Sequence, residues 1–308
     1  MMKFIRQILA RPGRGLASLG LALLATTLPG PLAPLASAHD GPIRIVAAEN
    51  FYADMARRIA GPDANIAAIL SNPNQDPHDF EASPATARLL ADADLVIYNG
   101  ADYDPWMESL LKASPSPARQ SLVAAAVMNR RSGDNPHLWY DPGTMPALAM
   151  ALAGALARSD PAHRSDYQNR AQAYRAALQP ISGKIAELKK KYGAIAVTAT
   201  EPVFGYMAEA LGFTMHNPRF QLAVMNGTEP SIGDVAAFED DLKNRRVRVL
   251  FYNSQVSDDL TGRLQQLARE SHVAVVGVSE TEPPDTDFPG WMLNQLNALD
   301  KALAGEGS

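Results

Sequence analysis

The stretch that decides the fold is residues 159–193, SDPAHRSDYQNRAQAYRAALQPISGKIAELKKKYG. It opens with Ser159-Asp160-Pro161, a capping side chain and a proline in the first turn, and it closes on Gly193, a typical helix end. Between them an apolar residue recurs every three or four positions, at Tyr167, Ala171, Tyr174, Leu178, Ile181, Ile185, Leu188 and Tyr192. This spacing predicts one helix over 160–192, about 48 Å long at 1.5 Å per residue.

Two details refine this prediction. Pro180 lies inside the helix, and it should kink the helix or leave one carbonyl unpaired. A coiled coil is an alternative, but the apolar stripe spans only about four heptads and is rich in Tyr and Ala. We therefore favour a single long helix that packs along two lobes.

Strands and helices alternate on both sides of the long helix. The predicted strands are 43–48, 66–70, 95–98 and 122–126 before it, and 194–198, 213–215, 247–252 and 273–278 after it. The predicted helices are 51–60, 83–91, 103–113 and 144–158, then 204–211, 231–244, 258–271 and 290–303. Such alternation is typical of parallel sheets covered by helices. We predict an α/β protein of two βα lobes with mainly parallel sheets joined by one long linker helix, with the lobes at 39–159 and 193–308.

Residues 1–38 have the pattern of a secretory signal peptide. A basic start is followed by an apolar run at 16–28 and by the small-residue cleavage site Ala36-Ser37-Ala38. A membrane anchor is the alternative, but the run is too short and three prolines follow it. Because no cysteine follows the run, we expect no lipid anchor. The mature chain is therefore expected to begin near His39 and to be periplasmic.

Composition limits the chemistry. The chain has 308 residues, a net charge of −5 and no cysteine. The absence of cysteine rules out disulfides, thiolate metal sites and cysteine nucleophiles. The mild acidity gives no reason to expect nucleic acid as a partner. Any metal site must use His, Asp, Glu or backbone oxygen.

Polar side chains gather in four loops near the carboxyl ends of predicted strands. These loops are 76–81, 135–138, 199–206 and 279–285. Open α/β sheets place their ligands at this edge. The loops offer His78, His137, Glu201 and one late carboxylate, a pair from each lobe. Each residue alone is more often a packing or solvated residue, but their shared position relative to the strands indicates a common site.

Two further residues bear on this site. His137 lies between Pro136 and Pro142, beside Trp139 and Tyr140, so its loop should be rigid. A rigidly held imidazole is well suited to present a neutral ring nitrogen to a metal. Glu49, just past the first strand, points to the same edge. It would either orient a ligand histidine or be a solvated carboxylate.

The chain resembles the substrate-binding proteins of zinc/manganese ABC transporters, the group with a rigid helix between its lobes. The resemblance covers the whole mature chain. It rests on Asp-Pro-His at 76–78 with Glu81 behind it, Asn-Pro-His-Leu-Trp at 135–139, Phe-Gly-Tyr at 204–206 and Thr-Glu-Pro-Ser at 228–231. It implies a metal held by His78, His137, Glu201 and a fourth ligand in the 280–287 loop. Glu280 is nearest the strand and is our choice, ahead of Glu282 and a later Asp.

The sequence departs from the family pattern at two ligand positions. Glu201 stands where zinc-binding members usually carry His, and the fourth position is Glu instead of Asp. A His-rich loop found in some zinc-binding members is also missing. Two imidazoles with two carboxylates make a harder site that favours Mn²⁺, yet Zn²⁺ stands above Mn²⁺ in intrinsic affinity. The sequence therefore leaves both metals open.

The resemblance implies a monomeric binding protein and no chemical step. It would capture one Mn²⁺ or Zn²⁺ ion and deliver it to an inner-membrane ABC permease with its ATPase. A metal-dependent hydrolase is one alternative, but the sequence has no H-E-x-x-H motif, P-loop or Ser-His-Asp spacing. Another alternative is a metal-binding adhesin or periplasmic metal buffer, which would use the same site with a different partner.

Overall fold

The computed structural model describes residues 41–72, 80–256 and 258–305. Residues 38–308 form one compact unit. The predicted signal peptide lies outside the described residues. Within the described part of the chain, no helix is long and apolar enough to cross a membrane.

The first lobe is built on a four-stranded sheet in the order β2-β1-β3-β4. Its strands are β1 (Ile43–Glu49), β2 (Ala64–Leu70), β3 (Leu95–Tyr98) and β4 (Gln120–Val123), and every pair is parallel. Its helices are α1 (Asn50–Ala60), α2 (Pro84–Ala91), α3 (Pro105–Ala113), α4 (Ala124–Val127) and α5 (Thr144–Ser159). The predicted alternation of strands and helices is confirmed.

The strand β1 shows why both faces of this sheet are covered. Successive side chains on a strand point to opposite faces. Ile45 and Ala47 pack with α1 and α5 on one side, whereas Val46 and Ala48 pack with Leu90 of α2 and with α3 on the other. All four strand residues are at most 2 % exposed. A continuous apolar run is the expected signature of such a doubly covered strand.

The second lobe repeats this plan with the strand order β6-β5-β7-β8. The strands are β5 (Ala196–Ala199), β6 (Thr214–Met215), β7 (Val249–Asn253) and β8 (Ala274–Val278), again all parallel. The helices are α8 (Gly205–Ala210), α9 (Pro218–Met225), α10 (Ile232–Lys243), α11 (Asp259–Glu270) and α12 (Phe288–Ala304). Helix α9 was not predicted. It starts at a proline that follows Asn217, whose backbone is left-handed.

The long linker helix is present but bent. It consists of α6 (Arg164–Ala177) and α7 (Gln179–Tyr192), with a break at Leu178, and a short 3-10 turn, Pro161–His163, precedes it. Pro180 is the second residue of α7, where its missing N–H costs no helical hydrogen bond. The predicted kink is confirmed, and the helix predicted over 160–192 is observed as a 3-10 turn followed by α6 and α7.

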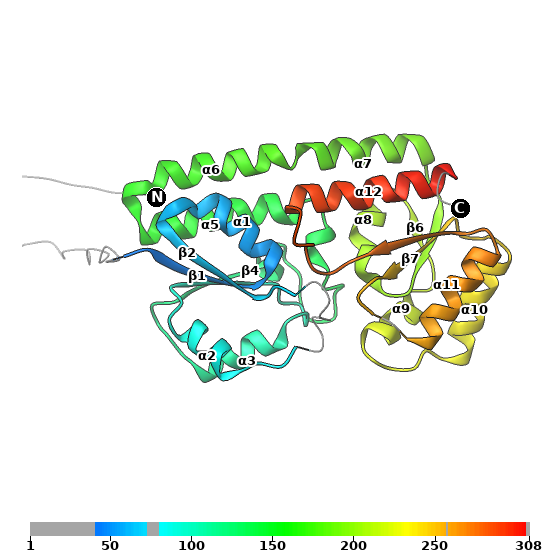
Figure 1. Cartoon of the computed structure of the whole chain (residues 1–308), viewed down its shortest axis with the longest axis horizontal. Coiled ribbons are helices and arrows are strands. Elements are labelled where there is room, and N and C mark those ends of the chain that lie inside the picture. Colours follow the sequence, from blue (N-terminus) through cyan, green and yellow to red (C-terminus); the bar gives the residue numbers. More distant parts are fainter. Residues whose placement is uncertain (1–40, 73–79, 257, 306–308) are drawn as a thin grey trace, which may run out of the picture. The chain divides into compact units, whose positions relative to one another are not determined.

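Both halves of the bent helix bury the predicted apolar stripe. Figure 1 shows α6 and α7 running end to end, with α12 beside α7. Seven of the eight predicted stripe residues are buried, from Tyr167 to Leu188, and they share one apolar core with β1, β5, α1, α5 and α12. Burying one such Leu or Ile side chain stabilises the fold by about 1.5–3 kcal/mol. The helix therefore joins both lobes to one core.

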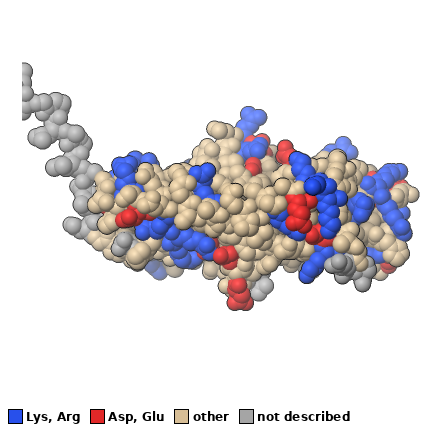
Figure 2. Space-filling model, turned by 90° about the horizontal axis from the view of Figure 1, so that it is seen from above, with Lys and Arg blue, Asp and Glu red and all other residues tan. Residues whose placement is uncertain are grey.

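The last stripe residue, Tyr192, is held by polar contacts. Its hydroxyl donates to Asp300 Oδ1 of α12 at 2.6 Å, and Lys184 and Lys191 each donate to the Asp300 carboxylate at 2.7 Å. Basic and acidic side chains lie next to one another on the face seen in Figure 2, above α6 and α7. The outer surface of the long helix is thus anchored to α12 by charge as well as by apolar packing.

Candidate metal centre

His137 is held by the loop in which it lies. Asn135 Oδ1 accepts a hydrogen bond from His137 Nδ1 at 2.8 Å and another from the His137 backbone N–H at 3.1 Å. Because that oxygen is an acceptor in both bonds, the proton is assigned to Nδ1 and the lone pair to Nε2, as metal binding requires. The ring is fully buried, edge-on to Tyr103 and Trp139.

The same loop is attached to the second lobe. Asn135 Nδ2 donates to the Pro202 carbonyl at 2.8 Å, and the Tyr206 hydroxyl donates to the Asn135 carbonyl at 2.8 Å. A side chain at Gly205 would place its Cβ 2.7 Å from Asn135 Nδ2, so this close approach needs glycine. The Phe-Gly-Tyr motif at 204–206 therefore helps to fix the histidine loop from across the two lobes.

The second lobe contributes two buried carboxylates. Glu201 follows β5 and is 5 % exposed, and Glu280 follows β8 and is fully buried. Asn253, the last residue of β7, donates from Nδ2 to Glu201 Oε2 and to Glu280 Oε1, each at 2.6 Å. Sequence reasoning missed Asn253. Its position at the carboxyl end of a strand, at the same edge as the two glutamates, was the available signal.

Residues from the two lobes meet at this edge. His137 Nε2 lies 3.5 Å from Glu280 Oε2, and Asn253 links Glu280 to Glu201. His78 lies outside the described residues. Among the residues that the structure does describe, no group of three or more His, Asp or Glu side chains is close enough together to hold a metal ion. The described part of the predicted site is therefore a histidine–glutamate pair with a second glutamate linked to it.

The other carboxylates of the late loop face different partners. The Glu282 backbone exchanges hydrogen bonds with the Asn50 side chain, and burial raises the pKa of the Glu282 carboxyl to about 8, with the charges of Asp54 and Asp287 adding to the effect. Asp287 caps α12 and pairs with Arg58 at 2.6 Å. The geometry therefore favours Glu280 as the carboxylate of this loop that faces His137.

Glu49 is the last residue of β1 and is fully buried, which excludes the solvated carboxylate among the two alternatives that the sequence left open. Burial, followed by the charge of Asp104, raises the pKa of the Glu49 carboxyl well above its usual value. Burial also raises the pKa of Asp104 to about 6, although the backbone N–H groups of Asn99 and Gly100 donate to its carboxylate at 2.6 and 2.7 Å. Two buried carboxyl groups thus lie together beside the His137 loop, to which Asn99 is joined through Pro136.

The remaining histidines have local partners or lie elsewhere. His163 Nδ1 lies 2.5 Å from Asp160 Oδ2, and His216 Nδ1 lies 2.8 Å from Asp241 Oδ2. The first contact lies at the start of α6 and the second lies within the second lobe. His39 lies outside the described residues. His163 and His216 are thus held by partners other than the candidate ligands.

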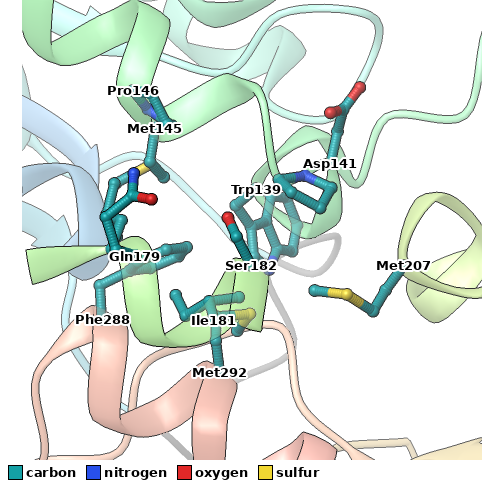
Figure 3. Close-up of a pocket in the computed structure, with 12 residues that line it drawn as sticks. Trp139, Asp141, Met145, Pro146, Gln179, Ile181, Ser182, Met207, Phe288 and Met292 are labelled. Carbon is teal, nitrogen blue, oxygen red and sulfur yellow. The ribbon is translucent and has the colours of Figure 1, made fainter. Parts of the chain in front are cut away.

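A small apolar cavity lies at the bend of the long helix, apart from the candidate ligands. Figure 3 shows its lining, with Met145 and Pro146 from α5, Ile181 and Ser182 from α7, Met207 from α8, and Phe288 and Met292 from α12. The cavity measures about 40 Å³, enough for a few water molecules. Trp139 also lines this cavity, and it lies two positions after His137 in the sequence. A small cavity therefore adjoins the bend at Leu178.

Comparison with known proteins then identifies the family. The sequence matches the family described as zinc-uptake complex component A, periplasmic, over residues 45–302. The chain belongs to this family. The zinc-uptake component A family consists of periplasmic metal-uptake components, so this protein is a metal-binding transport component and not an enzyme. The resemblance found in the sequence is confirmed.

Three relatives of the zinc-uptake component A family show how far the likeness extends. The manganese-binding lipoprotein MntA of Bacillus subtilis (strain 168) is 22 % identical over 283 residues, which cover 86 % of this chain and 90 % of MntA. The iron-binding protein YfeA of Yersinia pestis is 25 % identical over 245 residues, or 76 % of each chain. The periplasmic zinc-binding protein TroA of Treponema pallidum aligns with a TM-score of 0.73 at 20 % identity and covers 85 % of this chain and 99 % of TroA. That structural likeness confirms the fold of two parallel-sheet lobes.

Proposed function

We propose that this protein captures one divalent transition-metal ion between its two lobes and delivers it to an ABC permease with its ATPase. One observation carries the proposal. His137 of the first lobe and Glu280 of the second lie 3.5 Å apart, both buried, at the edge where the strands of both sheets end. Family membership supplies the transport context. It gives no support to a metal-dependent hydrolase.

We propose His78, His137, Glu201 and Glu280 as the four ligands. For His137 and Glu280, the support is their direct approach across the lobes. For Glu201, the support is its burial and the Asn253 amide that it shares with Glu280. The assignment of His78 rests on the sequence motif alone. Imidazole nitrogen and carboxylate oxygen are together a suitable donor set for Mn²⁺ and Zn²⁺.

The identity of the metal is the finer part of the proposal. The named relatives bind manganese, iron and zinc respectively, so likeness alone does not rank the metals. Two carboxylates make the proposed site harder than a histidine-dominated one, which supports Mn²⁺, whereas the general affinity order supports Zn²⁺. We propose that the site binds both Mn²⁺ and Zn²⁺. The ion that it carries then depends on which of the two is more abundant around the protein.

We further propose that the mature chain works in the periplasm after removal of residues 1–38, as a monomer without a lipid anchor. Several relatives are named lipoproteins. This chain contains no cysteine, the residue through which a thioether-linked lipid would be attached. The test is whether the exported protein is recovered in a water-soluble periplasmic fraction or with the membranes.

Metal titration tests the main proposal. The mature protein would be stripped with a chelator and titrated with Mn²⁺ and Zn²⁺, separately and in competition. Native mass spectrometry gives the stoichiometry and calorimetry gives the dissociation constant. We expect one ion per chain, with binding largely lost in His137→Ala and retained in the matched control His163→Ala, a histidine paired with Asp160 at a helix start. Several weakly bound ions, or equal binding by both variants, would contradict the proposal.

A second measurement separates delivery from storage. The metal-loaded protein would be added to ABC permease and ATPase pairs from the same organism, reconstituted in vesicles. Stimulated ATP hydrolysis and metal uptake support delivery to an importer. Tight metal binding with no stimulation would instead identify a periplasmic metal buffer or an adhesin.

A further inference from the structure

A large cleft opens on the second lobe between two loops at the carboxyl edge of its sheet. One wall is the end of α9 with residues 226–230, and the other is the start of α11 with Val256. The cleft measures about 780 Å³, far larger than the cavity at the helix bend. Its walls include Thr228, Glu229 and Pro230, which belong to the Thr-Glu-Pro-Ser motif that the proposed ligand set does not use.

The inner end of this cleft is Glu201, one of the proposed ligands. Glu201 is 5 % exposed, so the cleft reaches a carboxylate that is almost closed off from solvent. From there the contacts run on through Asn253 to Glu280 and from Glu280 to His137. The cleft therefore leads from the surface of the second lobe to the proposed metal centre.

The walls of the cleft are locally well defined. The Thr228 hydroxyl donates to the Ala223 carbonyl at 3.0 Å, which folds the 226–230 segment back onto α9. Ser231 Oγ caps α10 by accepting from the Asp234 N–H at 3.1 Å. Asp258 caps α11 by accepting from the N–H groups of Leu260 and Thr261 at 2.9 Å. These hydrogen bonds give the Thr-Glu-Pro-Ser motif a structural role and fix the local conformation of both walls of the cleft.

We propose that this cleft is the passage through which the hydrated cation reaches and leaves Glu201. The inference rests on the proposed function, and it adds a route and an order of contact. Among the described residues that line the cleft, four are Asp or Glu and none is Lys or Arg. Glu229 and Asp259 are exposed at its rim, and Glu201 is buried at its inner end. A cleft lined by one sign of charge concentrates ions of the other sign and speeds their association.

A bulky side chain in the passage gives the sharpest test. Asn226 is exposed and lines the cleft. In Asn226→Trp an indole would narrow the route without touching the proposed ligands. Since entry and exit use the same passage, metal association and dissociation should both slow by the same factor, and the dissociation constant should stay unchanged. The matched control is Ile232→Trp, which adds an indole at a position 90 % exposed that does not line the cleft.

Charge removal at the rim is the second, shape-conserving test. The double variant Glu229→Gln, Asp259→Asn keeps the cleft open and removes two negative charges. We expect Mn²⁺ association, followed by stopped-flow intrinsic tryptophan fluorescence, to slow by roughly three- to tenfold at low salt. The difference from wild type should shrink as ionic strength rises, because salt screens exposed charges. The control is Asp166→Asn on α6, which removes an exposed negative charge that does not line the cleft.

The outcomes separate this inference from the proposed function. If wild type binds no metal, the proposed function and the passage both fail. If wild type binds one ion tightly and both cleft variants keep wild-type rates, the passage alone is overturned. If the rates are unchanged but permease stimulation is lost in Asn226→Trp, the cleft is a protein-docking groove instead. If the association and dissociation rate constants of Asn226→Trp fall by the same factor, and those of Ile232→Trp do not fall, the passage is supported.

Discussion

His137 Nε2 lies 3.5 Å from Glu280 Oε2 although 143 positions of sequence and the two lobes separate them. Neither side chain reaches solvent appreciably. The pair brings an imidazole nitrogen of one lobe and a carboxylate oxygen of the other close enough to bind one divalent cation together. This is why the pair is central to the proposed function.

Asn253 should position both glutamates. In Asn253→Ala, Glu201 and Glu280 lose their shared amide donor and are left as two buried carboxylates that repel one another. Outer partners of metal ligands typically contribute about 10–100-fold to affinity. We expect Mn²⁺ and Zn²⁺ to bind weaker by about that factor at unchanged stoichiometry in calorimetry. Asn244→Ala, at an exposed helix end where the amide bonds to Asp240, should bind as wild type. Unchanged affinity in Asn253→Ala would remove Asn253 from the site.

The sequence predicted most of what places the site. The apolar stripe of the long helix can be recognised in the sequence because burial of one helix face imposes a period of three to four residues. The parallel sheets are legible because their strands are short apolar runs between helices. Since parallel strands end at the same edge, the loops of His137, Glu201 and Glu280 could be grouped before any contact was known.

The features that were missed depend on tertiary contacts. Asn253 reads as an ordinary polar residue at a strand end, and only the approach of β5 and β8 on either side gives it two carboxylates to bridge. Glu49 carries no sign of burial in its own sequence, because the α3 and His137 loops that cover it are distant in the chain. Helix α9 has only eight residues, too few for a clear apolar period, and its start depends on the left-handed Asn217.

The buried carboxyl pair of Glu49 and Asp104 should make stability depend on pH. Burial raises the pKa of both carboxyls, that of Asp104 to about 6. A carboxyl with a raised folded-state pKa favours folding below its unfolded pKa, and that contribution is lost as pH rises through the folded pKa. Wild type should therefore lose stability from about pH 4 upward, first through the Asp104 pKa of about 6 and then through the raised pKa of Glu49. Urea unfolding across that range would measure the loss.

Glu49→Gln isolates the contribution of one partner. Glutamine resembles the protonated acid and does not ionise, so the variant should become more stable relative to wild type as pH rises. The Glu49 side chain lowers the pKa of the Asp104 carboxyl through a hydrogen bond, and glutamine can donate a bond of the same kind, so the titration of Asp104 should move little. Glu187→Gln, an exposed change on α7, is the control. A stability difference between Glu49→Gln and wild type that stays constant with pH would refute this interpretation.

Asp300 should make the protein more stable as pH rises, which is the opposite of the effect expected for Glu49 and Asp104. Hydrogen bonds from Lys184, Lys191 and Tyr192 hold the pKa of its carboxyl well below the usual range. A lowered folded-state pKa stabilises the fold above the unfolded pKa, near 4, and this contribution disappears as pH falls. Asp300→Asn should therefore unfold at lower urea than wild type at pH 7, and the two midpoints should converge on acidification. A midpoint gap that persists at pH 2–3 would show that the loss is one of packing instead.

The shared core across the bent helix predicts a limited motion on metal binding. The buried stripe of α6 and α7 belongs to the same apolar core as both sheets, so a wide hinge opening would expose it. Because the chain has no cysteine, Lys112→Cys on α3 and Gln266→Cys on α11 would carry spin labels without further changes. The main peak of the label-to-label distance distribution should stay at the same distance when metal-free protein is loaded with Zn²⁺. A shift of more than roughly 5 Å would mean that the lobes move as rigid bodies about Leu178, where α6 and α7 are separated.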